Sequence, residues 1–454
     1  MAQVKQVRKY TKMIRISTLW AAVLFGTLFV LAGFFFQPSF AQAPAPSTVV
    51  FTGARLIDGT GRAPLEQGTL VISNGRVATI GARSAVKIPA GAVRVDVTGK
   101  TIVPGLINAH AHVNADPESN LPVRSQLIAQ LRLYADYGVT TVFVLGTTPA
   151  DVHEALQLRD EQAHETLDRA RLYAAGPSIR TAKTPDEARQ NVDRYADMKV
   201  DIIKMHINGN SSDMTPEVYG ALIDQAHKRG LRVAAHMYYL KDAQGLLNAG
   251  VDIFAHSVRD QDVPAAFLSG LKRRNVGYIA TLTRDLSIFV YETTPAFFSD
   301  PFFVKHEPSY RKQMTILKDP VLQETTRNSP EAQSIKQALQ QANRNLKILS
   351  DAGVPIAMGT DTGAQVGRWQ GYFEHTELEM MVKAGLTPMQ ALVAATGGAA
   401  RVTKLDGQLG TLEPGKFADF VVLNANPLSD IRNTRQVESV WIAGRQLPKM
   451  KESN

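Results

Sequence analysis

The chain has 454 residues, of which 44% are hydrophobic and 20% charged, which allows one large domain with a smaller one and excludes a disordered protein. The formal net charge is +8, but five basic residues lie within the first 15 residues, before any acidic residue, and removing those five leaves +3. This distribution argues against a nucleic-acid partner. The sequence has no cysteine, so metal ligands must come from His, Asp, Glu or Lys.

Residues 1–41 predict a targeting segment. The basic run is followed by an apolar stretch, residues 18–36, and by small residues at Ser39 and Ala41 that are typical of a signal-peptidase site. The alternative is an uncleaved N-terminal membrane anchor, because the apolar stretch approaches the ~20 residues that span a bilayer. Both interpretations predict export to the periplasm or the extracellular space, with residues 42–47 as a Pro-rich linker.

Short β-rich runs separated by turn signals fill residues 48–103, and a similar pattern returns only in residues 401–454. Asn74-Gly75 lies between two apolar runs and is a strong signal for a two-residue β-hairpin. Because neither set of strands is expected to form a stable domain alone, we expect the two chain ends to form one small β-sandwich.

Between these parts, residues 104–400 alternate strands with helices, which predicts βαβ units and a parallel sheet. Eight strand candidates in this segment match an α/β fold of the (β/α)8 TIM-barrel type. The candidates are Ile102–Asn108, Val139–Leu145, Arg171–Ala175, Asp201–Met205, Arg232–His236, Asp252–His256, Gly277–Ala280 and Pro355–Gly359. Residues 282–334 are too long for one connection and rich in aromatic residues, so we expect an insertion that acts as a lid.

The segment Val103–His112 ends the first barrel strand with His110 and His112, which point the same way because side chains alternate along a strand. Two neutral imidazoles that converge suit a zinc-like ion. Active sites of such barrels lie at the carboxyl ends of the strands. Further polar residues end or follow other strands, namely Lys204, His236, His256 and Asp361. Each alone fits an ordinary structural residue, but together the six predict a metal site.

These residues resemble the amidohydrolase superfamily over nearly the whole chain after the leader. Val103–His112 looks like the first-strand motif of the superfamily, and Gly359-Thr-Asp361 is similar to its eighth-strand motif. The segments Thr396–Ala400 and Gly410–Leu423 resemble the return into the β-sandwich.

Within the superfamily, Lys204 and the sequence around His236 and His256 look closest to the imidazolonepropionase-like and exported dipeptidase branch. One segment departs from that branch. Residues 174–183 lack the histidine that the dipeptidases usually carry after the third strand, which weakens a proline-dipeptidase assignment.

The resemblance implies two divalent metal ions. The implied ligands are His110, His112 and Asp361 for one ion and His236 and His256 for the other. Lys204 would be N-carboxylated to a bridging carbamate, because an ammonium group would repel a cation. A metal-bridged hydroxide would attack the substrate carbonyl, with Asp361 as general acid and base. Zinc is expected, with manganese, iron or cobalt as alternatives. A single ion beside an unmodified Lys204 stays an alternative.

Four further residues are candidates for contacts with the substrate. Tyr238 and Tyr239 follow the fifth strand and would donate to an oxyanion, or pack as ordinary aromatic residues. Arg259 would bind a substrate carboxylate, or form a surface ion pair. His206 shares the face of Lys204 and would contact the substrate or support the ligands.

The sequence therefore predicts an exported metal-dependent hydrolase that cleaves an amide-type C–N bond in a peptide-like or N-acyl small molecule. Within enzymes, the alternative is hydrolysis of a lactone, an ester or an organophosphate at the same site. From another class, the alternative is a non-catalytic metal-binding scaffold. No nucleic-acid partner is expected, membrane contact is expected only through an uncleaved N-terminal segment, and a homo-oligomer is left open.

Overall fold

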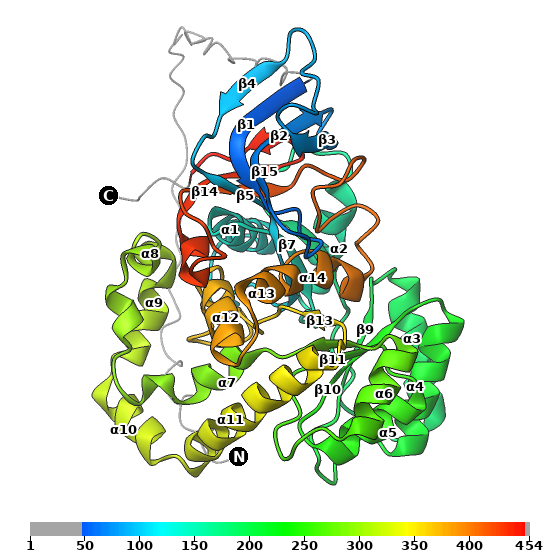
Figure 1. The fold of residues 1–454 in the computed structure, drawn as a ribbon. Helices are drawn as coiled ribbons and strands as arrows, with labels where there is room; N and C mark the ends of the chain where they lie inside the picture. The colour runs from blue at the N-terminus through cyan, green and yellow to red at the C-terminus, as the bar shows by residue number, and fades with distance from the viewer. Residues whose placement is uncertain (1–47, 450–454) are drawn as a thin grey trace, which may run out of the picture. The chain divides into compact units, whose positions relative to one another are not determined.

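The structure is a computed structural model that describes residues 48–449 (Figure 1). The predicted signal peptide or anchor, residues 1–41, and the linker that follows it lie outside the described residues. Among the described helices, none combines the length and the apolar character needed to cross a membrane. The domain boundaries predicted at residues 103 and 400 stay predictions.

Both ends of the described chain contribute strands to one sheet, as the sequence predicts, and this sheet has eight strands (Figure 1). Its hydrogen-bonded order is β16-β15-β14-β5-β1-β2-β3, with β4 paired to β1. The strands are β1 (Thr48–Leu56), β2 (Leu65–Ser73), β3 (Arg76–Ala82), β4 (Val93–Asp96), β5 (Thr101–Pro104), β14 (Phe420–Leu423), β15 (Val437–Ile442) and β16 (Arg445–Gln446). We call it the end sheet.

Two local features hold the end sheet together. The predicted hairpin is confirmed: β2 and β3 pair up to Ser73 and Arg76, and the turn residues Asn74 and Gly75 have φ of 50° and 75°. Two positive φ values are what this kind of tight hairpin turn requires. In the core of the sheet, the ring of Phe51 packs edge-on against Phe420 and Trp441, with centroids 5.1 and 4.9 Å apart.

The middle of the chain alternates parallel strands with helices, as the sequence predicts. The strands form a three-stranded and a five-stranded parallel sheet. They are β6 (Leu106–Ala111), β7 (Val139–Val144) and β8 (Arg171–Ala174) in the first, and β9 (Ile203–His206), β10 (Val233–His236), β11 (Ile253–Ala255), β12 (Gly277–Ile279) and β13 (Ile356–Ala357) in the second.

Backbone contacts join these two sheets at both edges. On one side, Ala175 bridges to Ile202, just after β8 and just before β9. On the other side, the amide of Ala109 donates to the carbonyl of Met358 at 2.9 Å, and Ala111 bridges to Thr362. The carboxyl ends of β6 and β13 are therefore held side by side.

The predicted first strand, Ile102–Asn108, is two strands. The chain leaves the end sheet after β5 and enters the parallel sheet at β6, with Gly105 between them. A Cβ at Gly105 would collide with the side chain of Thr140 on the neighbouring strand. A continuous apolar pattern does not reveal this break, because both strands are buried.

Helices cover the parallel strands and begin where capping signals predict. Thr215 accepts a hydrogen bond from the amide of Val218 at the start of α4, and Thr387 and Gln390 form the predicted capping box of α13. The helices outside the insertion are α1 (Val123–Asp136), α2 (Val152–Glu161), α3 (Pro185–Asp197), α4 (Pro216–Lys228), α5 (Leu240–Ala249), α6 (Ala265–Arg274), α12 (Tyr372–Lys383), α13 (Pro388–Ala394) and α14 (Gly397–Thr403).

The predicted insertion is helical throughout most of its length. It contains α7 (Leu282–Phe289), α8 (Pro301–Val304), α9 (Glu307–Leu317), α10 (Pro320–Asn328) and the start of α11 (Pro330–Asp351), with short 3-10 turns at Val290–Glu292 and Ala296–Ser299. Its buried aromatic residues, such as Phe298 and Phe303, pack with Trp369 and Tyr372 in a core of their own. A role as a lid stays a prediction.

Candidate metal centre

One cavity of about 590 Å³ lies at the carboxyl ends of the parallel strands. It is lined by all six predicted metal ligands, His110, His112, Lys204, His236, His256 and Asp361. A second cavity of about 600 Å³, between α1, α8 and β15, contains none of them. The group of three metal-ligating side chains found in the described part of the chain, His110, His112 and Asp361, lines the first cavity, so the candidate site is there.

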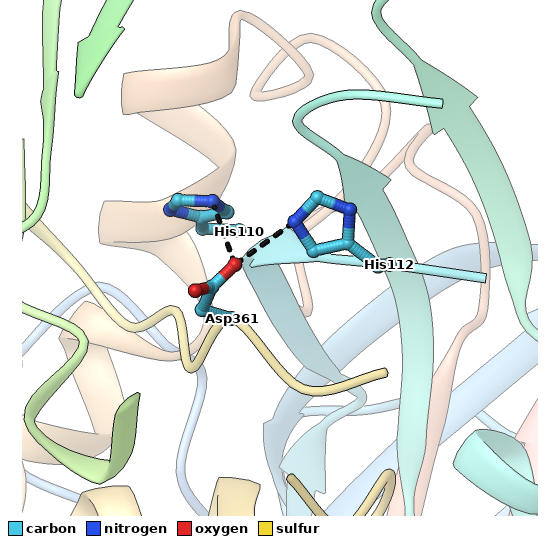
Figure 2. Close-up of side chains that lie close together, drawn as sticks. All are labelled: His110, His112 and Asp361. Atoms are coloured by element: carbon cyan, nitrogen blue, oxygen red, sulfur yellow. Dashed lines mark hydrogen bonds and ion pairs between the residues drawn. The ribbon is translucent and has the colours of Figure 1, made fainter. Parts of the chain in front are cut away.

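His110, His112 and Asp361 meet around a single oxygen atom (Figure 2). The Oδ1 atom of Asp361 lies 2.9 Å from Nε2 of His112 and 3.3 Å from Nε2 of His110. One ligand atom from each of the three residues lies within 4.8 Å of the other two. Two imidazoles and one carboxylate in this arrangement are a suitable donor set for one divalent ion.

The hydrogen bond on the far side of His112 fixes which nitrogen faces the site. Its Nδ1 lies 2.8 Å from the carbonyl oxygen of Gly146, which can only accept, so Nδ1 carries a proton. In the neutral ring, Nε2 then presents a lone pair to the Asp361 carboxylate. Two acceptors that face each other at this distance fit a site in which a cation lies between them.

The other two histidines stand beside this group. The ring of His256 lies 4.7 Å from that of His110 and 4.5 Å from that of His236, measured between centroids. Nδ1 of His256 lies 2.7 Å from the hydroxyl of Thr281, which orients the ring. The four imidazoles therefore form a continuous wall from His112 to His236.

Three residues of the site have a left-handed backbone that non-glycine residues seldom adopt. The φ angles are 61° at Asp361, 98° at His256 and 50° at Thr281. Such conformations cost about 1–3 kcal/mol each and persist where the surrounding structure holds them for a function. Three of the nine non-glycine residues with positive φ in the described chain are therefore two predicted ligands and the residue that orients one of them.

Lys204 contributes an amine without a partner. Its Nζ atom is buried and makes no hydrogen bond in the described structure. Burial lowers the pKa of Lys204 from 10.5 to about 7, although the nearby Asp361 opposes the shift. A neutral amine facing the ligands fits the carboxylated lysine that the resemblance implies, because only the neutral form reacts with carbon dioxide.

Burial and neighbouring charges keep the groups of the site in the protonation states that bind metal. Burial lowers the pKa of His110 to about 3, so its ring is neutral at pH 7. Burial alone would raise the pKa of Asp361, but the guanidinium of Arg368 and the two histidines outweigh it and hold that pKa well below its ordinary value. Neutral imidazoles and an ionised carboxylate are the forms that ligate a cation.

A buried carboxylate beneath the site fixes the ends of β6 and β13. Oε1 of Glu374 accepts hydrogen bonds from Asn108 at 2.6 Å, Thr360 at 2.9 Å and Thr362 at 2.7 Å. The backbone amide of His110 in turn donates to Oδ1 of Asn108. This network sets the positions of His110 and Asp361, and no periodic pattern in the sequence indicates the role of Glu374.

The structure brings one of the four predicted substrate residues into the cavity. His206 lines the wall, with its ring stacked on His236 at 4.6 Å. Tyr238 and Tyr239 lie beyond the cavity wall, in contact with each other. Arg259 is buried, and its Nε pairs with Asp285 at 2.6 Å. The roles predicted for these three residues stay predictions.

Three arginines that line the cavity were not identified as site residues from the sequence. Arg368 contacts Asp361 through an ion pair, Arg284 follows β12, and Arg180 follows β8. Arg180 and Arg368 are in loops, where no periodic pattern indicates which way a side chain points, and Arg284 lies in the first turn of α7. Their only signal in the sequence was their place after predicted parallel strands.

Comparison with known proteins places this geometry in a family. The model of the Amidohydrolase family matches residues 101–263 and 311–447. An uncharacterized protein of Mycobacterium tuberculosis is 31% identical over 169 residues, which are 35% of this chain and 45% of that protein. Ochratoxinase from Aspergillus niger is 26% identical over 244 residues, which are 52% of this chain and 42% of that enzyme.

A solved structure extends the likeness over most of the chain. A protein from Bifidobacterium longum is similar with a TM-score of 0.72 and 26% identity, covering 89% of this chain and 95% of that one. The matched region nevertheless spans less than half the length of the two curated relatives. The likeness therefore establishes a family and a fold.

Proposed function

The chain belongs to the amidohydrolase family, and from this premise we propose that it is a metal-dependent hydrolase that cleaves an amide-type C–N bond of a small molecule. The observation that carries the proposal is the donor set around Oδ1 of Asp361, with His110 and His112 at bonding reach of one ion. Peptide-like and N-acyl compounds are the substrate class. The match to the Amidohydrolase family model supports hydrolysis as the reaction type.

We infer that strands β6 to β13 form one closed (β/α)8 barrel, since backbone bonds link the two parallel sheets at both edges. The aromatic packing of Phe51 on Phe420 and Trp441 supports the predicted sandwich in the end sheet. In this fold the active site lies at the carboxyl ends of the strands, which is where the cavity is.

We propose two divalent ions, with zinc as the default. His110, His112 and Asp361 would hold the first, and His236 with His256 the second. Lys204 would lie between them as a carbamate, formed when its neutral amine adds carbon dioxide at Nζ and releases a proton. The unpartnered, buried Nζ supports this assignment.

A bound divalent ion would lower the pKa of a coordinated water to ~7 and polarise a substrate carbonyl. The residues of the chain supply the rest. Arg368 holds Oδ2 of Asp361, so that Oδ1 is turned toward the histidines. We propose that ionised Asp361 accepts the proton of the attacking water and delivers it to the leaving nitrogen.

The test is hydrolysis by protein stripped with a chelator and then reloaded with Zn²⁺ or Mn²⁺. The substrates are a panel of dipeptides and N-acyl amino acids beside matched esters and lactones. We expect metal-dependent cleavage of the amides that His110→Ala abolishes together with bound metal. His153→Ala is the control, because His153 is exposed on α2. Cleavage of esters or lactones alone would favour the alternative reaction, and metal binding without cleavage would favour a scaffold.

We propose that the protein is exported, on the basis of the basic and apolar segments in residues 1–41 and the small residues before position 42. N-terminal sequencing of protein from the periplasm or the medium tests this proposal. A mature chain that begins at Gln42 supports cleavage, an intact N-terminus in the membrane fraction supports an anchor, and an intact cytoplasmic protein contradicts export.

A further inference from the structure

The wall of the site cavity carries more positive than negative charge. The described residues that line it include three arginines, Arg180, Arg284 and Arg368, and a single carboxylate side chain, that of Asp361. Metal ions would add to this excess. A cavity of this kind concentrates anions, because the field of its fixed charges is not cancelled by the protein.

The arginines differ in how far acidic side chains neutralise their positive charge. Arg368 pairs directly with Asp361. Arg284 pairs with Asp285 at 2.8 Å, but that carboxylate is shared with Arg259 at 2.6 Å. One carboxylate therefore neutralises two guanidinium groups only in part, and Arg284 contributes some positive charge to the cavity.

Arg180 has no acidic partner among the described residues. Its Nη1 donates to Nδ1 of His206 at 3.1 Å, and a ring nitrogen that accepts a hydrogen bond carries no charge. Most of the guanidinium's five donors are left for other groups. The side chain is exposed while it lines the cavity, so an incoming molecule reaches it directly.

The position of Arg180 is fixed relative to the predicted metal ligands. The amide of Ile179 donates to the carbonyl of Lys204 at 2.8 Å, and the amide of His206 donates to the carbonyl of Ile179 at 3.1 Å. His206, which holds the guanidinium, is itself stacked on the ring of His236 with an angle of 6° between the planes. A group bound by Arg180 is therefore held beside the predicted metal ligands.

We propose that Arg180 is a specificity residue that binds a carboxylate of the substrate, with Arg284 adding a second positive charge. The inference rests on the proposed function, and it narrows the substrates to amides that carry an anionic carboxylate near the scissile bond. Arginine suits this role because its planar fork pairs with both oxygens of a carboxylate. A neutral substrate would leave the guanidinium group of Arg180 without an ionic partner in the complex.

The test compares kcat/KM for an N-acyl amino acid with that for its carboxamide, using the metal-loaded enzyme. We expect the wild-type enzyme to prefer the carboxylate, and Arg180→Gln to lose about 10- to 100-fold for the carboxylate with little change for the carboxamide. Arg180→Lys keeps the charge and should retain part of the preference. Arg189→Gln is the matched control, because Arg189 lies on the surface of α3 and pairs with Asp186.

Metal content, measured for every variant, separates this proposal from the proposed function. Equal preference in wild type and Arg180→Gln, at full metal content, overturns the role of Arg180. If no amide is cleaved, the proposed function fails, and binding of the N-acyl amino acid itself decides the anion site. Calorimetric binding that Arg180→Gln weakens and Arg189→Gln does not would support the site, and equal binding by all three proteins would refute it.

Discussion

Lys204→Met should stabilise the metal-free protein although it removes a predicted ligand. Lys204 is about 2% exposed, and its pKa falls from 10.5 to about 7 because burial disfavours the charged amine. At ~1.36 kcal/mol for each pKa unit, this difference corresponds to a penalty of about 5 kcal/mol on the folded state. Methionine has a similar length and no charge, and imperfect packing costs about 1 kcal/mol. We expect a net gain of about 4 kcal/mol at pH 7.

The gain depends on pH in a defined direction. Below pH 7 the amine of Lys204 is protonated in both the folded and the unfolded chain, so the full penalty applies. Between pH 7 and 10.5 the folded chain releases a proton that the unfolded chain retains, and the penalty shrinks as the pH rises. Above pH 10.5 both states are neutral, and wild type and variant should differ only by packing.

The assay is urea unfolding of chelator-treated protein from pH 6 to pH 10, with metal content measured on untreated samples. Lys228→Met is the matched control, because Lys228 is 62% exposed and pairs with Asp224 on the surface of α4. The control should change stability by less than about 0.5 kcal/mol. If Lys204→Met is no more stable than wild type at pH 7, or if the difference does not shrink at high pH, the amine is not buried and unpartnered as described.

Three further substitutions test one buried ion pair of the fold and two contacts of the site. Arg171→Met leaves the buried carboxylate of Asp419 without the guanidinium that pairs with it at 2.6 Å, and should lower the free energy of unfolding by about 3–5 kcal/mol in urea titration; a loss under 1 kcal/mol would contradict this. Thr281→Ala removes the partner of His256 Nδ1 and should weaken metal affinity about 10- to 100-fold in a chelator competition, whereas unchanged affinity would refute the orienting role. Gly363→Ala, at φ of 77°, drives a Cβ into the carbonyl of His112 and should lower bound metal; full metal occupancy would show that the loop can adjust.

The sequence predicts the residues of the site best where they follow strands. His110, His236 and Asp361 could be found because parallel strands end at a common edge, so a polar residue at each strand end points to one place. The alternation of side chains linked His110 to His112 in the same way. These inferences need only the strand period and the order of the strands.

What the sequence could not provide depends on contacts between segments far apart in the chain. Arg259 was predicted to bind a substrate carboxylate or to form a surface ion pair, and its partner Asp285, 26 residues away on α7, pairs with it in the interior. Arg180 and Arg368 are in loops without a period, so only the folded chain reveals that they line the cavity. The aromatic residues of the insertion likewise pack against residues such as Trp369 in a loop after β13, a contact that the sequence pattern does not indicate.

The most direct test of the metal centre is anomalous scattering from crystals of protein loaded with Zn²⁺. The account predicts one peak at about 2.0–2.2 Å from Nε2 of His110, Nε2 of His112 and a carboxylate oxygen of Asp361, and a second beside His236 and His256. Crystals of fully loaded protein without a peak at bonding distance from the first three residues would contradict it.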